Sequence, residues 1–426
     1  MTILFDRDVQ ADIEVATRGA LLGPTPAAQR ELRAHLAAHG RIPAMDARTV
    51  LQLATDSGLT GHGGAGFPLY RKLEAVLAAR GRAIVVANGA EGEPASTKDR
   101  WLLTRRPHLV LDGLQLVARA TKATEAYLYV NDRVPVAALT AELAERQRAG
   151  LDAVSVTVVA APEAFISGEE SALVSHLSGG SALPRFKSPR VTERGVRGRP
   201  TLVSNVETLA LLALIARRGA AWFRAMGTAD APGTMLLSVS GAVRRPGIIE
   251  VGHGTPLADV LDIAGGPSAP LQAVLLGGYH GTWLTAGEFA NAKLSRSDLS
   301  PLGASPGAGV VVALAEGACG LAEISRVISY LAQQSAGQCG PCLNGLPRIA
   351  QQVRSLALKG GDRRVVNEML RLGTIVVGRG ACHHPDGSMR FLRSGLRVFE
   401  AEVELHLAGR CSRTFNDVVL PIPVAR

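Results

Sequence analysis

Residues 46–160 alternate short apolar segments with longer segments of helical periodicity, and this alternation restricts the fold more than any other feature of the sequence. Helical patterns lie at 46–56, 70–79, 107–121 and 136–148, and apolar segments lie at 83–87, 126–130 and 154–159. Strands that alternate with helices of this length form crossover units on a parallel sheet. We therefore expect an α/β domain whose ligand site lies in the loops at the carboxyl ends of the strands.

The pattern changes twice further along the chain. Residues 179–200 are rich in glycine and arginine and predict a surface loop, and residues 202–217 predict a helix. Short strands are then predicted at 236–243, 247–251 and 273–277, around one helical segment at 257–264. Four consecutive helical patterns follow at 321–334, 346–358, 363–377 and 389–407. The second half therefore predicts a small mixed domain and a C-terminal four-helix bundle.

These changes predict five segments. They are a polar helical extension at 1–45, the α/β domain at 46–225, the mixed domain at 230–310, the bundle at 318–410 and a tail at 411–426. The total length of 426 residues fits two or three domains, and 47% apolar residues supply their cores.

The charge balance, 46 basic minus 37 acidic residues, gives +9 and favours acidic partners such as a ferredoxin-like protein. A general abundance of arginine explains the same number without any partner. Aromatic residues make up only 4% of the chain, which argues against a stacking surface for nucleic acid. The N-terminal residues 1–15 lack the apolar run of a secretory signal, and no uncharged stretch of about 18 residues predicts a membrane span. We expect a cytoplasmic protein that reaches the inner face of the membrane only through partners.

All five cysteines lie in the last quarter of the chain, at Cys319, Cys339, Cys342, Cys382 and Cys411. An odd number of cysteines without a secretory signal argues against a disulfide scaffold. Their clustering at one end favours a metal or iron–sulfur site.

A glycine-rich turn precedes the second helical pattern. Gly61, Gly63, Gly64 and Gly66 would let the backbone approach a flat or anionic ligand, and Lys72 on the following helix would reach a phosphate. The spacing is not the usual dinucleotide fingerprint, so a tight structural turn is the alternative.

Polar and acidic side chains follow two of the apolar segments. Asn88, Glu91 and Glu93 come after the segment at 83–87, and a second acidic pair, Glu169 and Glu170, follows a similar run. Carboxylates in such loops contact ligands or cap helices.

Five motifs in this order and spacing resemble the NADH-binding flavoprotein subunit of respiratory complex I and the related diaphorase subunits of hydrogenases and formate dehydrogenases. They are GHGGAGFP, NGAEGEPASTKDR, FISGEESAL, LPRFKSP and GRPTLVSNVETLA. The resemblance covers roughly residues 45–408. It implies a Rossmann-like flavin domain, a β-grasp domain of the soluble ligand-binding type, and a bundle that carries the iron–sulfur cysteines.

The resemblance also implies residue roles. The cofactors FMN and NADH would lie against Gly61, Gly63, Gly64, Ala65, Gly66, Phe67, Lys72, Asn88, Glu91, Gly168, Glu169, Glu170, Lys187, Ser204 and Asn205. Glu93, Glu169 and Glu170 would be the catalytic carboxylates, with NADH above the flavin. The implied reaction is hydride transfer from NADH to FMN and then single-electron transfer to a [4Fe–4S] cluster, in a complex with other redox subunits that reduces a quinone or a ferredoxin.

One departure from the family concerns the cluster. The family's CxxCxxC run begins here with Ala336, so Cys339, Cys342 and the distant Cys382 supply three thiolates where four are normal. Three interpretations stay open. A substitute such as His383, His384, Cys319 or Cys411 completes the cluster; a three-cysteine site holds a labile or three-iron cluster; or the cluster is lost. For the two histidines, a polar loop before Pro385 is the preferred interpretation.

Other departures concern the cofactor site. Ala90 and Phe165 replace an aspartate and a tyrosine of the family, at a cost of roughly 0.5–1.5 kcal/mol for each lost hydrogen bond. Phe67 is kept, but Ala75 and Arg190 replace two aromatics that clamp adenine. Three functions follow in order of preference: an NADH dehydrogenase subunit, a flavoprotein that exchanges electrons with a ferredoxin-like partner without NADH, and a non-catalytic assembly subunit.

Overall fold

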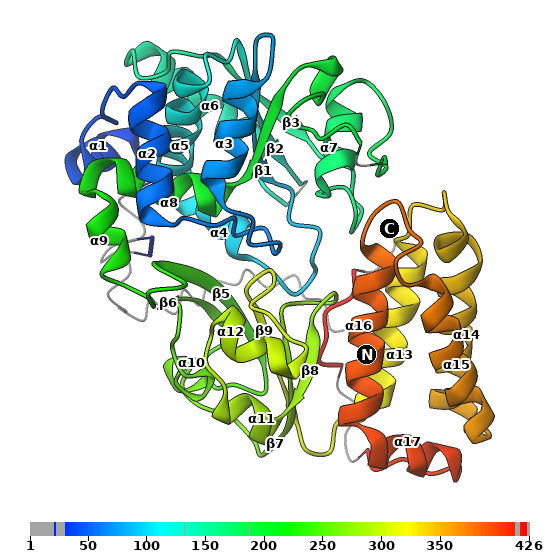
Figure 1. The fold of residues 1–426 in the computed structure, drawn as a ribbon. Coiled ribbons are helices and arrows are strands. Elements are labelled where there is room, and N and C mark those ends of the chain that lie inside the picture. The colour runs from blue at the N-terminus through cyan, green and yellow to red at the C-terminus, as the bar shows by residue number, and fades with distance from the viewer. Residues whose placement is uncertain (1–20, 23–29, 132, 187, 414–417, 424–426) are drawn as a thin grey trace.

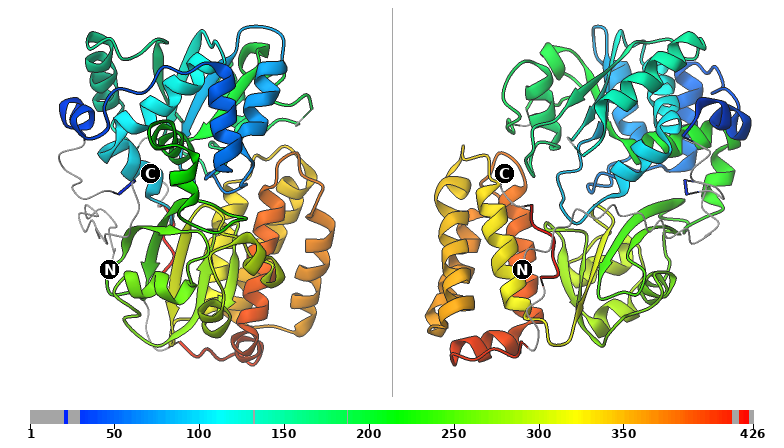
Figure 2. Two further views of the ribbon diagram at one scale, coloured as in Figure 1. Left: turned by 60° about the vertical axis from the view of Figure 1, so that its left-hand side comes forward. Right: turned by 180° about the vertical axis from the view of Figure 1, so that it is seen from behind.

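The computed structural model describes residues 21–22, 30–131, 133–186, 188–413 and 418–423. They form an α/β part, a part built on a mixed sheet, and a helical part (Figure 1). The mixed-sheet and helical parts lie side by side, and the α/β part lies across one end of both (Figure 2). The expected α/β class with a parallel sheet is confirmed.

The α/β part contains a four-stranded parallel sheet in the order β3-β2-β1-β4. Its strands are β1 (Ile84–Gly89), β2 (Glu125–Val130), β3 (Val156–Ala160) and β4 (Thr201–Asn205). Its helices are α1 (Leu32–His39), α2 (Ala47–Ser57), α3 (Leu69–Ala78), α4 (Lys98–Arg105), α5 (Pro107–Ala120), α6 (Val136–Arg148), α7 (Glu170–Leu177), α8 (Val206–Arg218) and α9 (Ala220–Arg224).

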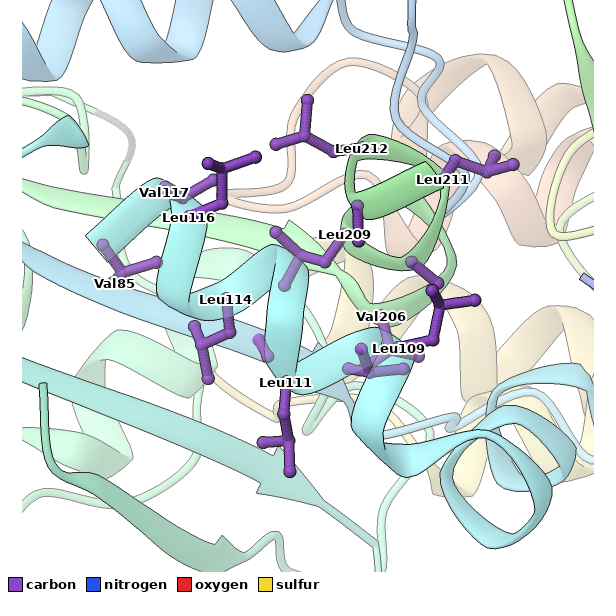
Figure 3. Packing of buried hydrophobic residues seen from close by; sticks show 14 of the residues in the cluster. Val85, Leu109, Leu111, Leu114, Leu116, Val117, Val206, Leu209, Leu211 and Leu212 are labelled. Carbon is purple, nitrogen blue, oxygen red and sulfur yellow. The ribbon is translucent and has the colours of Figure 1, made fainter. Parts of the chain in front are cut away.

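Alternate residues of the central strand β1 enter two different cores. Val85 belongs to a buried cluster with residues of α5 and α8 on one face, where Leu209 of α8 points toward α5 (Figure 3). Ile84 and Val86 pack on the other face in a smaller cluster with α7. Gly113 permits the close crossing of α5 and α8, because a Cβ at this position would clash with the backbone of Leu209. Burial on both faces fixes where the loops after β1 and β4 emerge.

The prediction of a helix over 202–217 is wrong at its start. Residues 201–205 form β4, which pairs with β1 so that Asn88 lies opposite Asn205. The helix α8 then begins at Val206, and the Asn205 side chain caps it by accepting a hydrogen bond from Glu207 N–H. Only Ser204 and Asn205 separate the buried segment TLV from the apolar helix, and so short an apolar segment cannot be distinguished from helix by periodicity alone.

The mixed sheet has five strands in the order β6-β5-β9-β7-β8, and only β5 and β9 are parallel neighbours. Its strands are β5 (Thr234–Gly241), β6 (Gly247–Gly252), β7 (Leu271–Leu276), β8 (Thr282–Thr285) and β9 (Val310–Ala315), with helices α10 (Leu257–Ile263), α11 (Ala286–Asn291) and α12 (Arg296–Leu299). The elements β8, β9, α11 and α12 were not predicted from the sequence.

The helical part comprises α13 (Gly320–Gln333), α14 (Leu346–Lys359), α15 (Arg363–Val376), α16 (His384–Val398) and α17 (Glu400–Leu407). The single helix predicted over 389–407 is therefore wrong. Two helices cover this region instead: α16 begins earlier, at His384, and Phe399 separates it from α17. The Phe399 ring packs edge-on against Trp283, with 5.1 Å between the ring centroids. The backbone N–H of Trp283 also donates to Ser394 Oγ at 3.0 Å, so this region joins the helical part to the mixed sheet.

Most of the predicted extension at 1–45 and part of the tail at 411–426 lie outside the described residues. Among the residues that the structure describes, no helix has both the length and the apolar character needed to cross a membrane.

Candidate functional site

A cavity of about 1240 Å³ opens at the carboxyl ends of β1 and β4. Its wall includes the glycine turn, the start of α3, the loop after β1, the segment before α7 and the segment at 185–198. The mixed sheet contributes Gly277 and His280, and the helical part contributes Cys382. The cavity is larger than a usual single-ligand pocket, which suits two neighbouring ligands.

The glycine turn is held in place by contacts on both sides. Thr60 and Pro68 pair as an isolated bridge at its base, and His62 N–H donates to Thr208 Oγ1 at 2.9 Å. Gly64 and Gly66 have φ values of +102° and +61°, which favour glycine. The turn leads directly into α3, whose N-terminal N–H groups favour an anion. The predicted residues Gly61, Gly63, Gly64, Ala65, Gly66 and Phe67 all line the cavity.

Lys72 supplies a positive charge on the α3 side of the cavity. Its ammonium group donates to Glu170 Oε1 at 2.8 Å and to the backbone oxygen of Val203 at 2.9 Å. The side chains of Lys72 and Glu170 are 26% and 42% exposed. An ion pair this open to solvent adds little stability, and the ammonium remains accessible to a ligand.

The loop after β1 is anchored by its own carboxylates. Glu91 accepts hydrogen bonds from the Ser96 hydroxyl and from the backbone N–H of Asp99 at 3.3 Å, at the start of α4. Glu93 accepts from Tyr279 N–H at 2.7 Å and so ties the loop to the mixed sheet. Burial raises the pKa of both Glu91 and Glu93 to about 7. Both line the cavity, but these contacts make them structural anchors, and a direct ligand role for either stays a prediction.

The two carboxylates before α7 differ in their contacts. Glu169 caps α7, because its side chain accepts from Ser171 N–H at 2.9 Å and from Ala172 N–H at 3.1 Å. Glu170 pairs with Lys72 across the cavity. Asn88 Nδ2 donates to Gly168 O at 2.9 Å and so connects this segment to the end of β1. The structure therefore brings together all three predicted loops.

A buried network of charges lies beneath the cavity. Lys98 Nζ lies 2.7 Å from Asp99 Oδ1 and 2.9 Å from Glu207 Oε2, and His62 Nδ1 lies 2.8 Å from Glu207 Oε1. Burial alone would raise the pKa of Glu207, but Lys98 and His62 overcome it and bring that pKa to about 2. Asn205 Nδ2 donates to Asp99 Oδ2 at 2.6 Å. The network orients Asn205, which lines the cavity together with Ser204.

Cys382 lines the cavity, and its thiol lies near enough to the Cys342 thiol to act on it electrostatically. The thiols of Cys339 and Cys342 are hydrogen-bonded, and burial together with the Cys339 and Cys382 thiols raises the pKa of Cys342 to about 12. The backbone N–H of Ala336 donates to Cys342 Sγ. Ala336 therefore lies next to Cys342, and its methyl group cannot bind iron.

Of the two neighbouring histidines, only His384 has both ring nitrogens engaged by described residues, whereas the contact of His383 involves Nδ1. His383 is exposed and its ring pairs with Asp386 Oδ2 at 2.9 Å. His384 is buried at the start of α16, 2.8 Å from Leu331 O and 3.1 Å from His280 Nε2. The prediction of a polar loop is therefore consistent with the exposed His383, but it is wrong for His384, which is buried in the first turn of α16.

Phe186 is a cavity residue that was not predicted from the sequence. Phe186 is 79% exposed and Phe67 is 41% exposed, and both line the cavity. Ala75 and Arg190, the two departures from the family's aromatic clamp, also line the cavity. The sequence signal for Phe186 was its place in the motif LPRFKSP, where an aromatic residue stands within an arginine-rich segment that was predicted to be a surface loop. Lys187 lies outside the described residues.

Phe165 has a structural role in this chain. Its ring contacts His280 at 4.8 Å and Tyr330 at 6.1 Å, both edge-on, and its N–H donates to Gln334 Oε1 at 2.8 Å. Phe165 therefore joins the α/β part to both other parts. Ala90 is buried on the cavity wall, where its backbone oxygen closely approaches Gly168.

Comparison with known families agrees with this arrangement. The model of the Nuo51 FMN-binding domain matches residues 54–213, that of the SLBB domain matches 236–278, and that of the NADH-ubiquinone oxidoreductase-F iron–sulfur binding region matches 322–406. Fold and site thus define a protein with an FMN-binding domain, an SLBB domain and an iron–sulfur binding region. The chain is 32% identical over 376 residues to the NADH-quinone oxidoreductase F 2 subunit of Rhizobium meliloti, covering 85% of this chain and 89% of that protein. It belongs to the family of NADH-quinone oxidoreductase F subunits, as the resemblance predicted.

Hydrogenase subunits are also similar. The chain is 33% identical to the alpha subunit of the NAD-reducing hydrogenase HoxS of Cupriavidus necator, over 78% of this chain and 56% of that protein. Among solved structures, an NAD⁺-reducing [NiFe]-hydrogenase in the air-oxidized state superposes with a TM-score of 0.82 at 32% identity, over 91% of this chain and 67% of the hydrogenase chain. The H₂-reduced state gives a TM-score of 0.79 at 33% identity, over 85% of this chain and 63% of that chain.

Proposed function

We propose that this chain is the electron-entry subunit of a multi-subunit NADH dehydrogenase, which oxidises NADH at FMN and delivers single electrons through an iron–sulfur centre. One observation carries the proposal. A single cavity is lined by the glycine turn, by the loops at the ends of β1 and β4, and by Cys382 of the iron–sulfur region. The flavin and the iron–sulfur region would therefore be neighbours.

The residues on the cavity wall fit FMN. The turn at 61–66 offers glycine backbone and the amino end of α3, and Lys72 offers a positive charge for phosphate. Asn88 and Asn205, paired across β1 and β4, provide polar groups at the strand ends. When bound, FMN supplies the chemistry that converts a hydride into single electrons, while the protein positions it.

The segment at 185–198 fits a dinucleotide. Arg185, Arg190 and Arg194 line the cavity beside Phe186. Guanidinium groups bind pyrophosphate, and exposed aromatic rings stack on adenine. Arg190 replaces one of the family's aromatic residues, but Phe186 on the same cavity wall supplies an aromatic ring. A ring that can stack on adenine favours NADH over a donor that lacks adenine. Glu170 would contact the flavin or the dinucleotide, and Glu169 and Glu93 would hold the surrounding loops.

The iron–sulfur region offers three of the four thiolates that a [4Fe–4S] cluster normally binds. Cys339, Cys342 and Cys382 provide thiolates, and we propose that one iron lacks a protein thiolate because Ala336 occupies the fourth position. When bound, the cluster supplies a one-electron carrier.

The domain and partner assignments belong to the same proposal. We propose that residues 46–225 form a Rossmann-like FMN domain, 230–310 a β-grasp domain and 318–410 the cluster-bearing helical bundle. Other redox subunits would bind in a hetero-oligomer that reaches the inner face of the membrane through them. They would pass the electrons to a quinone or a ferredoxin.

Anaerobic addition of NADH to the FMN-loaded chain tests the function. We expect the flavin absorbance to bleach, and NADH added to the flavin-free chain serves as the control. Bleaching by dithionite without bleaching by NADH would contradict the proposed donor.

A further inference from the structure

Four metal-binding side chains converge away from the flavin cavity, at the junction of the mixed sheet and the helical part. Cys319 lies between β9 and α13, Glu402 and His406 lie on α17, and Cys411 follows α17. One ligand atom from each lies within 4.8 Å of all the others. Cys319 Sγ lies 3.4 Å from His406 Nε2, and His406 Nε2 lies 3.1 Å from Glu402 Oε1.

Local structure holds these side chains in position. Glu402 and His406 are four residues apart on α17 and share one face of it. Cys319 caps α13, because its Sγ accepts from Ala322 N–H at 3.3 Å. The Glu402 carboxylate also accepts from the backbone N–H of Ser412 at 3.2 Å and from the Ser412 hydroxyl. Such outer contacts orient the ligands of a metal site.

The ligand chemistry favours zinc. Two thiolates, one imidazole and one carboxylate make a four-ligand set typical of Zn²⁺, whereas Mg²⁺ and Ca²⁺ prefer oxygen ligands only. Tetrahedral bonds of about 2.0–2.3 Å place ligand atoms roughly 3.3–3.8 Å apart, close to the separations seen here. Three of the ligand residues are buried, and the exposed Cys411 offers a path of entry. We propose that Cys319, Glu402, His406 and Cys411 bind a structural zinc ion, distinct from the iron–sulfur site.

The position of the site indicates its role. Residues 418–423 lie along α13, where Leu420 N–H donates to Glu323 Oε2 at 3.1 Å and Arg326 donates to Leu420 O at 3.2 Å. The hydroxyl of Tyr279, from the mixed sheet, donates to Pro421 O. A zinc ion would fix α17 and Cys411 to Cys319, which directly precedes α13. It would stabilise the folded chain by an amount that rises with the logarithm of its affinity.

Metal analysis of the purified full-length chain tests the proposal. After dialysis against EDTA and addition of zinc, we expect about one tightly bound zinc ion per chain in addition to any zinc held by the iron–sulfur cysteines. Zinc also binds iron–sulfur cysteines that lack iron, so the matched control is the double variant Cys339→Ser/Cys342→Ser. The control should keep its zinc, and Cys319→Ser/Cys411→Ser should lose it.

A milder variant covers the case in which the double serine variant does not fold. Glu402→Gln keeps the size of the side chain, and we expect it to release zinc to a chelator at least tenfold faster than the wild type. Cobalt(II) added in place of zinc should give the visible bands of a tetrahedral thiolate site in the wild type and in the control. Zinc that is retained by Cys319→Ser/Cys411→Ser, or a Cys319–Cys411 disulfide that forms in the chain purified under reducing conditions, would overturn the proposal.

Discussion

Replacing Lys72 by methionine tests the position of the flavin phosphate. The variant keeps a side chain of similar length and removes the ammonium that now bonds Glu170 Oε1 and Val203 O. A hydrogen bond to a charged group contributes about 1.5–3 kcal/mol, which corresponds to roughly a 10- to 150-fold weaker affinity for FMN. The unpaired Glu170 carboxylate would also repel the phosphate, so we expect the upper part of this range.

The effect on folding should be small, since the side chains of Lys72 and Glu170 are 26% and 42% exposed and their ion pair adds about 0–1 kcal/mol. The assay is titration of the flavin-free chain with FMN, followed by quenching of flavin fluorescence. Lys293→Met is the matched control, because Lys293 is exposed and lies outside the cavity wall. An FMN affinity for Lys72→Met within twofold of the wild type, or an equal loss in Lys293→Met, would refute the placement of the phosphate.

Four further changes have defined outcomes. Glu207→Gln should lower the free energy of unfolding, measured in urea, by about 3–5 kcal/mol, because buried Lys98 loses a charged partner. The pKa of Glu207 falls from 4.5 to about 2 on folding. The stability that Glu207 provides should therefore be complete above about pH 4.5 and disappear toward pH 2. The pKa of Glu93 rises from 4.5 to about 7, so this residue should make the wild type less stable as the pH rises through that window, and Glu93→Gln should reduce the decrease in Tm between pH 4.5 and 7. Ala336→Cys should raise the iron retained after EDTA treatment, as measured by iron analysis, because it restores a fourth thiolate; equal retention would show that the fourth position is filled otherwise. Phe186→Ala should raise the KM for NADH roughly 2- to 10-fold with ferricyanide as acceptor and leave the FMN content unchanged, as expected for a lost stacking contact.

The sequence predicted best the helices with a clear apolar periodicity or a clear capping residue. Asp46 caps α2 and Pro107 begins α5, so both helices were expected within a residue or two of their observed limits. The strand β4 was missed because only Ser204 and Asn205 separate its short apolar segment from the apolar helix α8. Whether Leu202 belongs to strand or helix is decided by pairing with β1, a contact more than 100 residues away.

The cavity could be predicted from motifs, but the role of each carboxylate could not. Glu91, Glu93 and Glu169 follow strands as ligand-binding residues do, yet all three accept hydrogen bonds from backbone N–H groups. Backbone capping and ligand binding use the same residue types in the same loops. Convergence of Cys319 with His406 depends on the packing of α17 against α13, which no local pattern specifies.

Electron paramagnetic resonance of one preparation, reduced with NADH under anaerobic conditions, tests most directly whether electrons pass from NADH through the flavin to the cluster. If a single cavity places flavin beside the iron–sulfur cysteines, NADH should produce the signal of a reduced cluster in the FMN-loaded chain and not in the flavin-free chain. A cluster that dithionite reduces in both preparations, but that NADH reduces in neither or in both alike, would contradict this electron path.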